Sequence, residues 1–192
     1  LIIIRVVVDY TTMIRRHLTE HLLQALADTP VVLVNGARQT GKSTLVQSAE
    51  LTRPSRQYLT FDDPGVLGAA KRDPSGFIAG LNTPFTLDEV QHVPELFPAI
   101  KMAVDRKREP GRFLLTGSAN VMLLPKLSES LAGRMEVLTL WPFSQGEMNS
   151  VNEGFIDALF SKQPVWPSGQ SSRVGRDELF EKVLAGGYPL VI

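Results

Sequence analysis

The stretch VVLVNGARQTGKST, residues 31–44, decides the fold of this chain. Its first four residues are apolar and predict a short buried strand, and its remainder fits the pattern G-x-x-x-x-G-K-[ST]. Glycines let the loop amides turn inward toward a phosphate, the lysine adds a positive charge, and the serine hydroxyl suits Mg²⁺. We therefore expect a P-loop that binds ATP and Mg²⁺, formed by Gly36, Ala37, Arg38, Gln39, Thr40, Gly41, Lys42, Ser43 and Thr44.

Outward from this loop, short apolar strands alternate with amphipathic helices through residue 140. The alternation predicts an α/β fold, a parallel sheet with helices on both faces, which is the three-layer sandwich of P-loop NTPases. The stretch Asp62 to Gly65 is expected to be a turn that closes a strand. Strands are predicted at 31–34, 57–61, 84–87, 112–115 and 136–140, and helices at 14–26, 42–49, 94–107, 121–131, 155–160 and 177–184.

Two adjacent acids follow the strand predicted at 84–87. A P-loop requires a carboxylate at the end of a neighbouring strand to hold Mg²⁺ through water, and Asp88 is in that position. Glu89 then points in a different direction, so it can orient and deprotonate the attacking water. The competing interpretation is a solvated acidic turn without a catalytic role.

The strand predicted at 112–115 also ends in polar residues, Thr116-Gly117-Ser118. If this strand neighbours the P-loop strand, its end lies beside the γ-phosphate. Ser118, or failing that Thr116, would then hydrogen-bond the phosphate or the attacking water. The alternative is a Ser/Thr turn that caps the next helix.

Five motifs together resemble a family of bacterial and archaeal AAA+-type ATPases. In sequence order they are GARQTGKST, LDEVQHVPELFPAIK, FLLTGSAN, SESLAGR and LTLWPFSQGE, and the match covers residues 13–192. In that family the ATPase module is followed by a C-terminal domain of unassigned function, for which nuclease-like character is one interpretation. That domain is not part of this sequence.

The resemblance implies a five-stranded parallel sheet in the order 5-1-4-3-2, with Asp88-Glu89 as its second acidic motif and Ser118 as the sensor of the γ-phosphate. It also implies that Arg134 stabilises γ-phosphate charge, in a neighbouring subunit of a homo-oligomer. The alternative for Arg134 is a surface arginine that pairs with Glu129 or Glu136. The turn at 186–189 is similar to the Gly-Pro turn that lies against adenine in related ATPases.

Length and composition suit one globular domain with the start of a second. We expect an uncertain N-terminal extension at 1–12, a P-loop ATPase core at 13–146, and the beginning of a helical lid region at 147–192. The chain is 43% hydrophobic, and 20 basic residues balance 20 acidic ones, so no global charge attracts nucleic acid or a membrane. The absence of cysteine makes a cytoplasmic location the natural expectation.

Two further patterns carry less weight. The stretch HLTEH at 17–21 fits H-x-x-E-H, but two ligands do not close a zinc site, and a solvated helix face is the better interpretation. A basic cluster at 101–112 is interrupted by Asp105 and Glu109 and contains no aromatic stacking residues. Nucleic-acid binding is therefore expected only through this weak patch or through the C-terminal domain found in the family.

The function expected from these residues is Mg²⁺-dependent ATP hydrolysis coupled to conformational change. Lys42, Glu89, Ser118 and Arg134 are the expected catalytic residues, and Ser43 and Asp88 the expected metal-side residues. The alternative function is a nucleotide-dependent switch or scaffold with little turnover. Phosphoryl transfer to a small molecule is disfavoured because no arginine-bearing lid is recognisable, and GTP because no N-K-x-D segment occurs.

Overall fold

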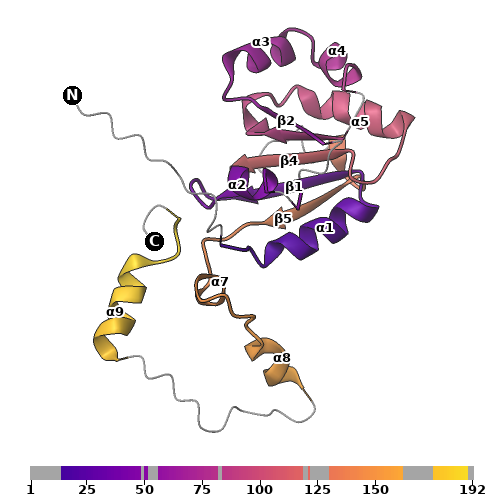
Figure 1. Cartoon of the computed structure of the whole chain (residues 1–192). Helices are drawn as coiled ribbons and strands as arrows, with labels where there is room; N and C mark the ends of the chain where they lie inside the picture. The colour runs from indigo at the N-terminus through magenta and orange to yellow at the C-terminus, as the bar shows by residue number, and fades with distance from the viewer. Residues whose placement is uncertain are drawn as a thin grey trace, which may run out of the picture.

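A computed structural model describes residues 14–48, 50–51, 56–81, 84–118, 121, 130–161 and 175–189 (Figure 1). The strands are β1 (Val31–Gly36), β2 (Gln57–Thr60), β3 (Phe85–Asp88), β4 (Phe113–Ser118) and β5 (Met135–Thr139). The helices are α1 (Leu18–Asp28), α2 (Lys42–Val46), α3 (Pro64–Arg72), α4 (Pro74–Ala79), the 3₁₀ turn η2 (Val90–His92), α5 (Leu96–Arg106), α7 (Gln145–Met148), α8 (Phe155–Phe160) and α9 (Arg176–Ala185).

The five strands form one parallel sheet in the order β2-β3-β4-β1-β5. This is the predicted order 5-1-4-3-2 read from the other edge, so the predicted fold class is confirmed. The register aligns Gly36 of β1 with Ser118 of β4, and Thr60 of β2 with Asp88 of β3. The carboxyl ends of these four strands therefore meet at one edge of the sheet.

Strand β1 is buried on both faces because its side chains alternate between two separate cores. Val31 and Leu33 pack with residues of α3, α4 and α5 on one face of the sheet. Val32 and Val34 pack with residues of α1 and α2 on the other face. The helices cover the two faces accordingly, which gives the three layers visible in Figure 1. A central strand of this kind holds its C-terminal loop on a rigid support.

One prediction near β2 was wrong. The stretch from Asp62 to Gly65 begins helix α3 instead of only closing the strand. The Asp63 carboxylate accepts hydrogen bonds from the amides of Gly65 and Val66, at 2.7 and 3.2 Å, and Pro64 is in the first turn. A capping aspartate followed by proline is a favourable helix start. The helix predicted at 121–131 lies mostly outside the described residues.

The elements after β5 pack much less tightly than the sheet. α8 and α9 form where helices were predicted, and they lie apart from the sheet in Figure 1. No residue of α9 is buried, and Leu184 is 84% exposed. Within the part of the chain that the structure describes, no helix is both long enough and apolar enough to cross a bilayer.

Candidate nucleotide site

The loop between β1 and α2 follows a path that two glycines make possible. A Cβ on Gly36 would lie 2.3 Å from the carbonyl oxygen of Leu140, so only glycine allows β1 to end this close to the segment after β5. Gly41 has a φ of 89°, in the left-handed region, and it directly precedes α2. The predicted strand, loop and helix therefore occur in the order that a phosphate-binding loop requires.

The side chain of Lys42 is directed back over this loop. Its Nζ donates hydrogen bonds to the carbonyl oxygens of Gly36 and Ala37, at 3.2 and 2.8 Å, and the residue is only 5% exposed. Burial lowers the pKa of Lys42, and the nearby carboxylates of Glu89 and Asp88 partly oppose this effect. A buried ammonium whose partners in the loop are neutral carbonyls is well suited to an anionic phosphate.

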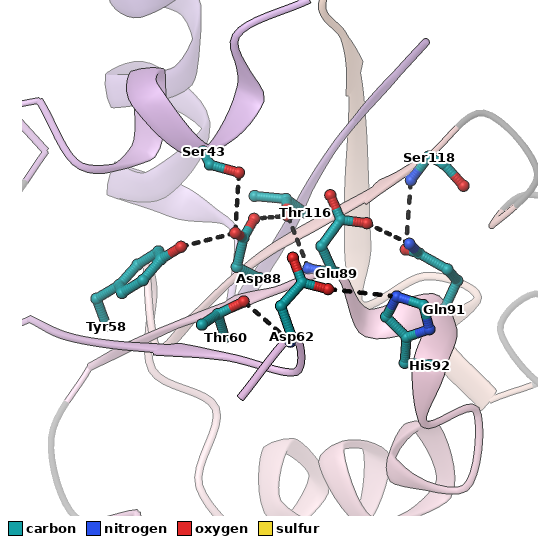
Figure 2. A network of polar contacts seen from close by, with 10 residues as sticks. All are labelled: Ser43, Tyr58, Thr60, Asp62, Asp88, Glu89, Gln91, His92, Thr116 and Ser118. Carbon is teal, nitrogen blue, oxygen red and sulfur yellow. Dashed lines mark hydrogen bonds and ion pairs between the residues drawn. The ribbon is translucent and has the colours of Figure 1, made fainter. Parts of the chain in front are cut away.

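Asp88, at the end of β3, accepts hydrogen bonds from three hydroxyl groups (Figure 2). Ser43 Oγ donates to its Oδ2 at 2.9 Å, and Tyr58 Oη of β2 donates to the same oxygen at 2.6 Å. Thr116 Oγ1 of β4 donates to the other oxygen, Oδ1. The structure thus brings Ser43 and Asp88 together, and their hard oxygen atoms suit Mg²⁺.

Tyr58 is a member of this cluster that the sequence did not reveal. Burial, followed by its hydrogen bond to the Asp88 carboxylate, raises the pKa of Tyr58 above its ordinary value. Its phenol therefore remains a proton donor to Asp88 at physiological pH. β2 places Tyr58 there because Tyr58 pairs in register with Thr86, two residues before Asp88.

Glu89 points away from Asp88, as Figure 2 shows. Its backbone has a φ of 60°, an uncommon left-handed conformation for a residue other than glycine, and its amide donates to Thr116 Oγ1 at 3.0 Å. Its carboxylate accepts a hydrogen bond from Gln91 Nε2. The Oε1 of the same Gln91 accepts from the backbone amide of Ser118 at 3.3 Å. Gln91, which the sequence did not reveal, therefore bridges Glu89 and Ser118.

Arg134 lies at the opposite edge of the sheet. It precedes Met135, whose register partner on β1 is Val31, whereas the P-loop follows Gly36. Five strand residues separate the two edges by roughly 16 Å. Its guanidinium forms a two-pronged ion pair with Asp105 of α5, at 2.6 and 3.1 Å. The suggested pairing with Glu136 is thus incorrect, Glu129 is outside the described residues, and Arg134 does not reach the P-loop of its own chain.

A cavity of about 320 Å³ adjoins the P-loop on the side of α1. Gly41 and Thr44 line it from the loop, Ile14 from the segment before α1, and Phe143 and Pro189 from the C-terminal part. The volume is within the range of small-ligand pockets. The carbonyl oxygen of Gly187 accepts a hydrogen bond from the Phe143 amide at 2.6 Å, which anchors the turn at 186–189 beside this cavity.

The two weaker sequence patterns gain no support from the geometry. Among the described residues, no group of three or more His, Asp or Glu side chains is arranged to hold a metal ion. In the basic cluster, Lys107 pairs with Glu109 at 2.6 Å, and Arg112 donates to the carbonyl of Ala103 at 2.8 Å. Part of the positive charge that a nucleic acid would contact is therefore already engaged within the protein.

Comparisons with known proteins identify the class. The family model described as "AAA domain" matches residues 28–149. Uncharacterized proteins of Mycobacterium tuberculosis and Mycobacterium bovis are each 42% identical over 155 residues, which cover 80% of this chain and 34% of each relative. The crystal structure of a DNA replication initiation factor superposes with a TM-score of 0.51 at 16% identity, over 76% of this chain and 50% of that one.

The chain belongs to the AAA domain family. Its sheet, its P-loop and the acidic end of β3 are those of an AAA+-type P-loop ATPase, a nucleotide-binding class. The chain spans about a third of the length of the curated relatives that it matches.

Proposed function

We propose that this domain binds ATP together with Mg²⁺ and hydrolyses it, and that hydrolysis changes the arrangement of the segment after β5. The observation that carries the proposal is the contact between Ser43 Oγ and Asp88 Oδ2 at 2.9 Å. This contact joins the P-loop to a carboxylate on another strand, where Mg²⁺ would bridge the protein and the β- and γ-phosphates. The Mg²⁺ ion would neutralise charge that develops on the transferring phosphoryl group.

Each remaining residue then has a defined role. Lys42 contacts the β- and γ-phosphates, and the backbone amides of residues 36–44 surround them. Glu89 orients the attacking water and accepts its proton, while Ser118 contacts the γ-phosphate or that water. The cavity lined by Ile14, Phe143 and Pro189 accepts the adenine base. Its largely apolar lining supports this role.

Arg134 contributes to a different copy of the domain. Since it is at the far edge of its own sheet, we propose that it acts on the γ-phosphate bound by a neighbouring subunit. This requires a homo-oligomer in which the amino edge of one sheet faces the P-loop edge of the next. The ion pair with Asp105 would hold the guanidinium in place, or would exchange for the phosphate when subunits assemble.

A nucleotide-dependent switch with little turnover is the second candidate. It is favoured by one observation, the hydrogen bond from Gln91 to the Glu89 carboxylate, because a Glu89 held in this way is less free to act as a base. The two candidates share ATP binding and differ only in rate.

Turnover and affinity of the wild type and of Glu89→Gln separate the two candidates. An ATPase would release phosphate in the wild type and lose roughly 100-fold or more of that rate in Glu89→Gln, with ATP affinity retained. A switch would bind ATP in both proteins and release phosphate at a negligible rate in both. Failure of the wild type to bind ATP would contradict both candidates.

A further inference from the structure

Arg16 is a buried arginine that joins the P-loop to the segment after β5. It lies just before α1 and is only 7% exposed. Its Nη1 donates to the carbonyl oxygen of Thr40 in the P-loop at 2.8 Å, and its Nη2 donates to the carbonyl oxygen of Trp141 at 2.6 Å. One guanidinium therefore contacts two backbone segments that are about 100 residues apart in the sequence.

The other partner of Arg16 is also buried. Arg16 Nε pairs with Glu147 Oε1 at 3.1 Å, and Glu147 is 6% exposed. The same oxygen accepts a hydrogen bond from the His17 amide at 2.7 Å, and Oε2 accepts one from the Ser144 amide at 3.0 Å. A buried ion pair is costly unless its polar atoms are satisfied, and here they are satisfied by backbone groups of both segments.

The guanidinium also forms one wall of the cavity beside the P-loop. Its Cζ lies 4.3 Å from the centre of the Phe143 ring, and a Cβ on Gly41 would lie 3.6 Å from Nη1. Phe143 is in turn bonded through its amide to Gly187. A continuous set of contacts thus runs from Thr40 through Arg16 and Phe143 to the turn at 186–189.

We propose that Arg16 is a positioning residue for nucleotide binding, which holds the P-loop and the segment 141–147 in one arrangement so that each responds to the other. The inference rests on the proposed ATP binding and adds a route by which the bound nucleotide acts on the C-terminal part of the domain. The fork of donors on an arginine is essential here, since a lysine supplies a single ammonium that cannot span the same three acceptors.

Three variants test this role by titration of a fluorescent ATP analogue with Mg²⁺, at a temperature where circular dichroism shows every variant folded. Arg16→Lys should weaken binding roughly 10- to 100-fold, the range expected for one lost charge-assisted hydrogen bond. Glu147→Gln, which keeps an acceptor oxygen but removes the charge, should weaken it less. Val104→Ala is the control for general destabilisation, because Val104 is buried in the core on the other face of the sheet. It should bind within twofold of the wild type.

Hydrogen exchange of the segment 141–147 supplies a second readout. In the wild type, nucleotide should slow amide exchange in this segment, and in Arg16→Lys saturating nucleotide should leave the exchange rate nearly unchanged. Wild-type affinity in folded Arg16→Lys, or equal protection of the segment in both proteins, would overturn the inference. Absence of binding by the wild type would overturn the proposed ATP binding, and the role of Arg16 with it.

Discussion

The hydroxyl of Ser43 lies 2.9 Å from a carboxylate oxygen of Asp88, although 45 residues separate them in the sequence. β3 is not adjacent to β1, because β4 lies between them in the sheet. The contact therefore depends on the P-loop and α2 extending over the end of β4 toward β3. This is the arrangement in which a metal ion between the two side chains would also reach the phosphates of a nucleotide in the loop.

Removing the P-loop lysine should abolish most ATP binding. Lys42→Ala deletes a charged contact worth about 1.5–3 kcal/mol, which corresponds to a loss of roughly 10- to 150-fold in affinity. Isothermal titration with ATP and Mg²⁺ measures the effect. Lys71→Ala, an exposed lysine in the last turn of α3, is the matched control and should bind as the wild type does. Equal affinities for the two variants would contradict the role of Lys42.

The hydrogen bond from Tyr58 should influence the Mg²⁺ requirement. In Tyr58→Phe the Asp88 carboxylate loses one of its donors, so its orientation toward the metal is less fixed. We expect the Mg²⁺ concentration for half-maximal ATP binding to rise roughly tenfold, as is typical when a partner of a metal ligand is removed. Nucleotide affinity in EDTA is the internal control and should not change. An unaltered Mg²⁺ titration would show that Tyr58 only packs against β3.

Two variants at the amino edge of the sheet test the role of Arg134. Arg134→Ala should slow hydrolysis by assembled protein roughly 100-fold or more while ATP affinity stays nearly intact. Asp105→Asn removes the ion pair but retains the arginine, so it should keep turnover within a few-fold of the wild type. If the pair is only a surface contact, both variants will hydrolyse ATP at the wild-type rate.

Acid should weaken the junction formed by Arg16 and Glu147. Burial alone would raise the pKa of Glu147, but amide hydrogen bonds from His17 and Ser144, together with Arg16, lower it below the ordinary value of 4.5. A carboxyl whose folded-state pKa is lowered contributes stability above its unfolded pKa, and this stability is lost as the pH falls through the folded-state value.

Urea unfolding of the wild type and of Glu147→Gln between pH 7 and pH 3 measures this contribution. At pH 7 the variant should be less stable by about 3 kcal/mol, because Arg16 loses a buried partner. The difference should shrink steadily once the pH is below 4.5, the ordinary pKa of the carboxyl. A difference that is constant with pH would show that the charge of Glu147 does not contribute.

The core of the site follows from the sequence because it depends on local spacing. The P-loop pattern fixes Gly36, Lys42 and Ser43 relative to one strand and one helix, and an acid that directly follows a strand must lie at the carboxyl edge of the sheet. Strand order and the position of Asp88 could therefore be predicted from apolar runs and their polar ends.

The supporting residues could not be predicted in the same way. Tyr58 reaches Asp88 only through the register of β2 on β3, and Arg16 reaches Thr40 and Glu147 through the packing of three distant segments. A single tyrosine or arginine carries no pattern that reveals such a contact. Gln91 is close in sequence to Glu89, yet its bridge to Ser118 depends on how β4 lies beside β3.

The central claim is that the P-loop and Asp88 enclose a metal-bound triphosphate. A crystal structure with a non-hydrolysable ATP analogue and Mn²⁺ tests it most directly, because the anomalous signal of manganese locates the ion. We predict one peak next to Ser43 Oγ and within one bridging water of the Asp88 carboxylate, with the β- and γ-phosphates under the loop amides. A metal elsewhere, or phosphates outside the loop 36–44, would contradict the account.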